Sequence, residues 1–295
     1  MNADILRFHG LCLDYTSAAG SIRALENLEF SVACGEPLVL IGPSGCGKTS
    51  TLLLAAGLLR PTSGEVQVDG AVIRTPRPAT ALILQEYGLL PWKTVFENAA
   101  LGLRIRHLTR TQITERTLAA LEQVELAQFA KNYPDELSGG MRQRLALARA
   151  LTLDADLLLM DEPLSALDAM LREGMQDTLL RLWQTRQHAQ VLVTHSIEEA
   201  AFLGRRIAVY SARPGTIRVW LDNPGMGDLD YRADPAYSRC CLELRKMLRC
   251  VSAESSAGGG FSVTASRLPP LSQQRPGADA GLDVFASGKG GGVDA

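Results

Sequence analysis

Residues 42–49, GPSGCGKT, decide how the rest of the chain can be interpreted. They match the pattern G-x-x-x-x-G-K-[ST] of a phosphate-binding loop and lie between an apolar run, PLVLI, and a segment with helical patterning. In such a loop backbone N–H groups surround phosphate oxygens, the lysine reaches the β- and γ-phosphates, and the next hydroxyl holds Mg²⁺. Lys48 and Thr49 are therefore predicted to bind a nucleoside triphosphate with Mg²⁺. The positions predicted to contact the nucleotide are Gly42, Pro43, Ser44, Gly45, Cys46, Gly47, Lys48, Thr49 and Ser50.

A second apolar run, LLLMDE at residues 157–162, ends in two acidic residues. Asp161, at the end of the predicted strand, suits a position close to Mg²⁺, and Glu162 can act on an attacking water as a general base. Two adjacent acids after a strand can also simply cap the next element. Their combination with the phosphate loop favours the catalytic interpretation.

The order of apolar runs and helical patterns predicts three regions. Residues 1–222 alternate short strands with helices, which indicates an α/β domain with a mainly parallel core sheet. Within it, residues 1–41 and the hairpin signal GEVQVDGAVI indicate an antiparallel β subdomain, and residues 86–152 indicate a helical subdomain. Residues 223–250 are expected to form a helical extension. Residues 251–295 are rich in Gly, Ser, Ala and Pro and are expected to form a disordered tail.

Composition narrows the possible functions. The net charge of −2 argues against a general nucleic-acid-binding protein. Three arginines in the basic helix, Arg142, Arg144 and Arg149, are better explained by a solvated helix face or by pairing within the chain than by nucleic-acid binding. The six cysteines form no metal-type CxxC pair, which indicates reduced thiols. No apolar run approaches the ~18 residues of a membrane span, so a membrane role would depend on a partner.

Further short motifs follow in a fixed order, and with them the chain resembles the ATP-binding subunits of ABC transporters over residues 1 to about 210. The resemblance implies a P-loop NTPase of the ABC cassette type, with a mainly parallel core sheet, an antiparallel β subdomain and an α-helical signature subdomain. The motifs are LDYTS (13–17), ILQEYGLLPW (83–92), LSGGMRQR (137–144), SALD (165–168) and VTHS (193–196).

The resemblance assigns roles to individual residues. It implies that Gln85 reaches Mg²⁺ and the attacking water, that His195 contacts the γ-phosphate, and that Tyr15 stacks on the adenine. Asp168 takes the D-loop position beside the nucleotide. Two of these residues have simpler alternatives, because a tyrosine in a β segment is often a packing residue and a histidine after a strand is often structural.

The signature motif, LSGGMRQR, is a second phosphate-binding pattern, and the resemblance explains why the chain carries it. In the family, the signature of one subunit closes over ATP held by the phosphate loop of the other. Ser138, Gly139 and Gly140 would therefore bind the partner's γ-phosphate at a helix start. A homodimer or heterodimer of ATPase subunits, arranged head to tail, would complete two sites.

Residues 88–103 and the stretch SARPGTI (211–217) resemble the importer group for nitrate, taurine and aliphatic sulfonates. This implies transmembrane permease subunits, an extracytoplasmic solute-binding protein and a peripheral position at the cytoplasmic face of the inner membrane. Met141 and Ser196 depart from the commoner residues of the family.

The alternative functions are a soluble ABC-type ATPase of DNA repair or translation, or another phosphate-loop GTPase or kinase. The single cassette, without heptads or a zinc pattern, argues against the former, and the signature and histidine motifs argue against the latter.

Overall fold

The computed structural model describes residues 3–17 and 20–257. The predicted tail therefore lies outside the described residues from position 258 onward. Within the described part of the chain, no helix combines the length and the apolar character needed to cross a membrane.

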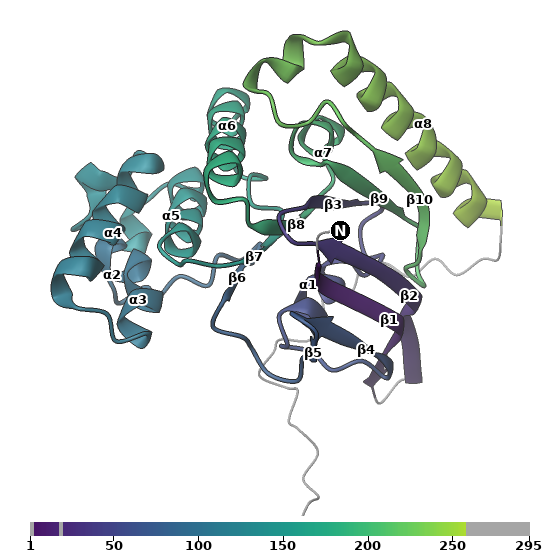
Figure 1. The fold of residues 1–295 in the computed structure, drawn as a ribbon, viewed down its shortest axis with the longest axis horizontal. Helices are drawn as coiled ribbons and strands as arrows, with labels where there is room; N and C mark the ends of the chain where they lie inside the picture. Colours follow the sequence, from purple (N-terminus) through teal and green to yellow (C-terminus); the bar gives the residue numbers. More distant parts are fainter. Residues whose placement is uncertain (1–2, 18–19, 258–295) are drawn as a thin grey trace, which may run out of the picture. The chain divides into compact units, whose positions relative to one another are not determined.

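A six-stranded sheet in the order β10-β9-β3-β8-β7-β6 forms the centre of the fold (Figure 1). All neighbours in it are parallel except β10, which pairs antiparallel with β9. The strands β3, β7 and β8 are buried at every position, because helices and the second sheet cover their faces. The predicted parallel core sheet is thus confirmed. Its strands are β3 (Pro37–Ile41), β6 (Thr80–Ile83), β7 (Leu157–Asp161), β8 (Ala189–Thr194), β9 (Arg206–Tyr210) and β10 (Ile217–Asp222).

The predicted antiparallel β subdomain is a four-stranded sheet in the order β2-β1-β4-β5. The hairpin between its last two strands turns at Asp69 and Gly70, whose φ angles are 53° and 74°. Two successive positive φ values are typical of the tight turn that an Asp-Gly pair favours, so this hairpin prediction is confirmed. The strands are β1 (Asp4–Ser17), β2 (Gly20–Ala33), β4 (Ser63–Val68) and β5 (Ala71–Val72).

The helix α1 (Lys48–Ala55) lies between the two sheets and contributes Leu52 and Leu54 to the core that joins them. A separate group of helices, α2 to α5, follows β6 and forms the predicted helical subdomain (Figure 1). Its helices are α2 (Val95–Ala99), α3 (Leu101–Ile105), α4 (Arg110–Gln123) and α5 (Gly139–Leu151), with short 3₁₀ turns η1 (Ala127–Phe129) and η2 (Pro134–Glu136).

The helices α6 (Ala169–Arg186) and α7 (Ile197–Leu203) follow the core strands β7 and β8. In α6, Met175 and Leu179 are buried and lie on a face that packs into the core. The helix α7 packs on β3 and on the C-terminal helix α8 (Pro235–Ala257). The turn η3 (Leu229–Ala233) precedes α8.

The C-terminal helix α8 (Pro235–Ala257) is longer than expected. Placing the end of the helical extension at residue 250 was wrong, because the helix continues through residues 251–257. Leu244 and Val251 are both buried and lie seven residues apart, so one apolar face continues past the point where the composition changes. Packing of that face extends the helix into a segment whose composition indicated a tail.

Candidate active site

The phosphate loop joins β3 to α1 and adopts a conformation that only glycine tolerates at two points. Gly45 and Gly47 have φ angles of 76° and 101°. A Cβ atom on Gly47 would lie 2.5 Å from Leu25 Cδ2, so the loop also approaches β2 too closely for a side chain. The loop therefore curls around the start of α1, where free N–H groups and the helix dipole favour an anion.

The side chain of Lys48 is held inside this loop. Its ammonium group donates to the Gly42 and Pro43 carbonyls at 2.8 and 2.9 Å, and the residue is 7 % exposed. Cys46 is buried beside it, with Sγ 3.6 Å from Lys48 Nζ. Burial raises the pKa of the Cys46 thiol, although the nearby ammonium partly opposes this. The lysine charge is thus fixed at the loop that would receive phosphate.

Asp161 ends β7 directly beside α1. It is buried, and burial raises the pKa of its carboxyl group, while a hydrogen bond from the Thr49 side chain and the charge of Lys48 oppose the rise. A hydroxyl and a carboxylate oxygen in contact, next to a phosphate loop, form the hard donor set that Mg²⁺ prefers together with phosphate oxygens. Thr49 and Asp161 therefore fit a Mg²⁺ site, and binding of the ion by these residues stays a prediction.

Glu162 and His195 face each other across the ends of β7 and β8. His195 Nδ1 lies 3.2 Å from Glu162 Oε1, which leaves Nε2 of the largely exposed imidazole ring available for another partner. Glu162 has a φ of 48°, a left-handed conformation that costs a residue other than glycine about 1–3 kcal/mol. Its backbone N–H donates to the Val193 carbonyl at 2.9 Å. The sequence placed these two residues in one site, and the structure brings them into contact.

Gln85 lies just after β6 with an exposed side chain. Among the described residues, no hydrogen bond joins it to Thr49 or Asp161, so its contact with Mg²⁺ remains a prediction. The backbone that follows it is anchored from α5, because the Arg149 guanidinium donates to the Tyr87 and Gly88 carbonyls. Burial lowers the pKa of Arg149, whose charge is directed at backbone carbonyls.

The arginines of α5 mostly pair within the chain. Arg144 donates to the Val124 carbonyl at 3.1 Å and contacts Glu125 at 3.2 Å. Arg149 holds the segment after Gln85. For these two residues the expected intramolecular pairing is confirmed.

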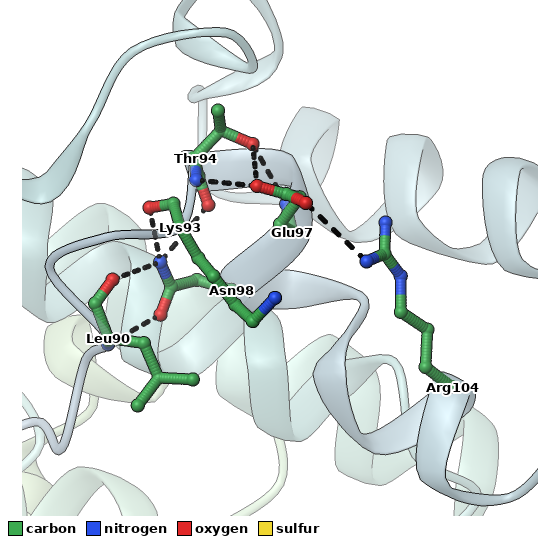
Figure 2. A network of polar contacts seen from close by, with 6 residues as sticks. All are labelled: Leu90, Lys93, Thr94, Glu97, Asn98 and Arg104. Atoms are coloured by element: carbon green, nitrogen blue, oxygen red, sulfur yellow. Dashed lines mark hydrogen bonds and ion pairs between the residues drawn. The ribbon is translucent and has the colours of Figure 1, made fainter.

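Figure 2 shows how the loop at residues 90–94 is built around one buried amide, that of Asn98. Its Oδ1 accepts from the Leu90 N–H at 2.8 Å, and its Nδ2 lies 3.0 Å from the Leu90 carbonyl. The same nitrogen contacts the Lys93 and Thr94 carbonyls at 2.9 and 3.0 Å. In the loop that Asn98 holds, the Trp92 residue is 70 % exposed.

Tyr15 reaches the phosphate-loop helix from β1. Its hydroxyl lies 3.0 Å from Ser50 Oγ, and the ring is partly buried against the core that includes α1. This position accounts for the residue by packing and also places it beside the nucleotide loop. Adenine stacking by Tyr15 stays a prediction.

The signature residues start α5 at an open surface. Ser138 caps the helix, its Oγ accepting from the Met141 N–H at 3.3 Å, and a Cβ on Gly139 would meet nothing within 4 Å. A Cβ on Gly140 would lie 3.1 Å from Leu167 Cδ2 in the loop before α6. Figure 1 shows α5 and α1 separated by β6 and β7. The two phosphate-binding patterns of the chain therefore do not face each other within one molecule.

Asp168, the last residue of that loop, caps α6. Its Oδ1 accepts from the Leu171 N–H at 3.1 Å, and its side chain is exposed. Arg172 holds the loop from the next helical turn, with Nη2 2.7 Å from the Leu167 carbonyl. A contact of Asp168 with nucleotide remains a prediction.

The sequence interpretation missed two buried groups at the site. Gln143 is 1 % exposed, and its amide links α5 to the backbone of Glu162 and of Ala166. Glu199 is buried next to His195, its Oε2 accepts a hydrogen bond from the Thr194 hydroxyl, and burial raises its pKa to about 7. The available signal was weak: each is a polar helix residue that is followed by apolar residues three and four positions later.

A small cavity of about 40 Å³ lies beside Glu162, His195 and Glu199. One buried polar atom beside it, Glu199 Oε1, has no hydrogen-bond partner among the described residues. The cavity is lined by Glu162, Leu164, Ser165, Arg172, Thr194, His195, Ser196 and Glu199.

A phosphate loop on a parallel sheet, with a buried aspartate and a glutamate–histidine pair at the carboxyl ends of the next strands, defines a nucleoside triphosphatase of the phosphate-loop class. The comparisons narrow this class. The family model described as ABC transporter matches residues 25–165. The chain is 47 % identical over 203 residues to a taurine import ATP-binding protein TauB of Burkholderia pseudomallei (strain 1710b), covering 69 % of this chain and 78 % of that protein.

Two further matches are also ATP-binding proteins of this kind. An aliphatic sulfonates import ATP-binding protein SsuB of Bacillus anthracis is 42 % identical over 204 residues, covering 69 % of this chain and 80 % of that protein. The dimeric post-hydrolysis structure of the ATP-binding cassette MJ0796, bound to ADP and Pi, superposes with a TM-score of 0.68 at 29 % identity, covering 74 % of this chain and 98 % of that one. The chain belongs to the ABC transporter family as an ATP-binding cassette, and it is an ATPase.

Proposed function

We propose that the protein is the ATP-hydrolysing subunit of an importer for a small solute, with nitrate, taurine and aliphatic sulfonates as the candidate classes. The observation that carries the proposal is the set of relatives at 41–47 % identity whose names specify import of taurine or aliphatic sulfonates. The alternative, a soluble ATPase of DNA repair or translation, has no observation in its favour.

The proposed reaction is attack of water on the γ-phosphate of ATP, in which the bond from the γ-phosphorus to ADP breaks and ADP and phosphate leave. Lys48 and the loop N–H groups hold the phosphates, and Glu162 takes a proton from the attacking water. The imidazole of His195, oriented by Glu162 at 3.2 Å, presents Nε2 to the γ-phosphate. Thr49, Asp161 and Gln85 would hold Mg²⁺, which would supply positive charge to the phosphate oxygens when bound. Tyr15 stacks on the adenine.

The proposed assembly is a head-to-tail pair of ATPase subunits. Ser138 and the N–H groups of Gly139 and Gly140 lie at an open helix start, where an anion brought by a second subunit is favourable. Asp168, exposed beside them, would line the same interface. The dimeric arrangement of the cassette MJ0796 supports this proposal.

The proposed permease contact is the loop around Trp92. A tryptophan that is 70 % exposed on a backbone fixed by Asn98 is suited to insert into a partner. Permease subunits contacted here would place the protein at the cytoplasmic face of the membrane, while an extracytoplasmic solute-binding protein supplies the solute.

The first test is a mild-detergent pull-down of the tagged full-length chain from its native membranes, with partners identified by mass spectrometry. Recovery of a multi-span permease is expected. Recovery of only ribosomal or repair proteins would contradict the transport role and leave the ATPase mechanism unaffected.

The solute class needs a second test, which is growth of a strain that lacks the gene. Loss of growth on taurine or an alkanesulfonate as sole sulfur source, with normal growth on sulfate, is the expected result. A defect with nitrate as sole nitrogen source would move the assignment to nitrate.

A further inference from the structure

Gln143 connects three parts of the site through one side chain. It lies on α5 four residues after Gly139, hence on the same side of the helix one turn later. Its Nε2 donates to the Glu162 carbonyl at 3.1 Å, and its Oε1 accepts from the Ala166 N–H at 3.0 Å. Both ends of this buried amide are therefore satisfied by backbone groups of other elements.

The backbone that Gln143 contacts is strained. Glu162 has a φ of 48°, and a residue other than glycine keeps such a conformation only where its surroundings hold it. On one side the Glu162 N–H is fixed to Val193 in β8. On the other side its carbonyl accepts from the Gln143 amide and from the Ser165 hydroxyl at 3.1 Å each. Gln143 is the one of these groups that comes from the signature helix.

We propose that Gln143 is a positioning residue that holds the catalytic Glu162 of its own chain through its amide. This inference rests on the proposed role of Glu162 as general base. The helix whose start would contact the partner's nucleotide is then the same helix that fixes the base for the chain's own nucleotide. Loss of the amide would release Glu162 from a geometry in which a displacement of about 1 Å costs about 10²-fold in rate.

The first experiment separates turnover from binding in the purified full-length protein. In Gln143→Leu, kcat for ATP hydrolysis is expected to fall about 10- to 100-fold, while the Kd for ATP stays within about twofold. Gln176→Leu is the matched control, because Gln176 is another buried glutamine on a helix and its Oε1 accepts from Arg232 at 2.7 Å, away from the phosphates. Equal kcat values for the two variants would overturn the proposal.

A second variant covers the possibility that Gln143→Leu does not fold. Gln143→Met has a similar volume, but its side chain has no N–H that could donate to the Glu162 carbonyl. It is expected to show the same fall in kcat with unchanged ATP affinity. Wild-type kcat in this variant would show that the donated hydrogen bond does not position Glu162.

Mixed dimers with two purification tags identify the chain on which Gln143 acts. The reference is one wild-type subunit with one Glu162→Gln subunit. Adding Gln143→Leu to the Glu162→Gln subunit should leave the reference rate unchanged, because that subunit's base is already lost. Adding it to the other subunit should lower the rate about tenfold or more.

The reverse pattern would mean that Gln143 acts on the partner's site through the signature end, and it would overturn the proposal. Two rates near the reference would overturn it as well. These assays use ATP hydrolysis alone, so a failure of the proposed import function would leave their outcome unchanged.

Discussion

The phosphate-loop end and the signature end of the molecule differ in how far the chain satisfies its own polar groups. At the phosphate-loop end, Lys48 and Asp161 are buried and have hydrogen-bond partners within the chain. At the signature end, Ser138 is exposed and the space around Gly139 is open. The side chains at the phosphate-loop end are held in place within one chain, and we call it the built end. The signature end, where the helix start is open to a second molecule, is the open end.

The largest expected effect tests the built end. Glu162→Gln should lower the rate of ATP hydrolysis about 10²- to 10⁴-fold, because it removes the proposed general base, while ATP binding persists. Steady-state hydrolysis and equilibrium nucleotide binding measure the two effects separately. Lys48→Ala is the contrasting variant, which should lose ATP affinity itself. Normal turnover in Glu162→Gln would refute the assignment of the base.

The next effect tests the open end. Ser138→Arg should leave ATP binding by the monomer intact, block ATP-driven dimerisation and lower hydrolysis about 10²-fold, because it removes a donor from the partner's site and adds bulk there. Size-exclusion chromatography with ATP, in a Glu162→Gln background, measures dimerisation. Thr109→Arg is the matched control, since Thr109 caps α4 in the same way away from the site. A Ser138→Arg protein that still dimerises with ATP would show that Ser138 does not contribute to the partner's nucleotide site.

A smaller effect concerns the stability of the built end. The folded-state pKa of Glu199 is raised from 4.5 to about 7, chiefly by burial. Between these values the unfolded chain has lost the proton that the folded chain retains, so stability falls as the pH rises from 4.5 through 7. The full effect above pH 7 is on the order of 3 kcal/mol.

Glu199→Gln should therefore be more stable than the wild type at pH 8, and the difference should shrink toward pH 4.5. The carboxylate is flanked by Arg172 and His195, which favour its charged form, and by Glu162, which opposes it. Urea denaturation at the two pH values measures the difference. Exposed Glu198→Gln should change stability little at either pH. A stabilisation that is equal at both pH values would exclude titration of Glu199 as its cause.

The smallest effect is expected from residues that belong to neither end. Deleting residues 258–295, beyond the last turn of α8, should leave ATP hydrolysis within about twofold of wild type, because the site lies within residues that the deletion spares. The same ATPase assay with soluble yield measures this. A collapse in yield would show that the deleted residues support the fold.

The sequence was informative where function depends on contiguous residues. The loop at 42–49 has a fixed spacing set by phosphate geometry, and the fold class follows from the strands and helices around it. Gln143, Asn98 and Glu199 could not be found in this way, because their roles depend on partners that folding brings together. The end of α8 was missed for the related reason that packing of Leu244 and Val251 outweighs local composition.

The loop held by Asn98 has a consequence for binding. Its backbone contacts to one side-chain amide are made before any partner arrives. A protein that docks on Trp92 therefore meets a loop with little conformational entropy left to lose, and more of the contact energy appears as affinity. The proposed permease contact can then be small in area and still be tight.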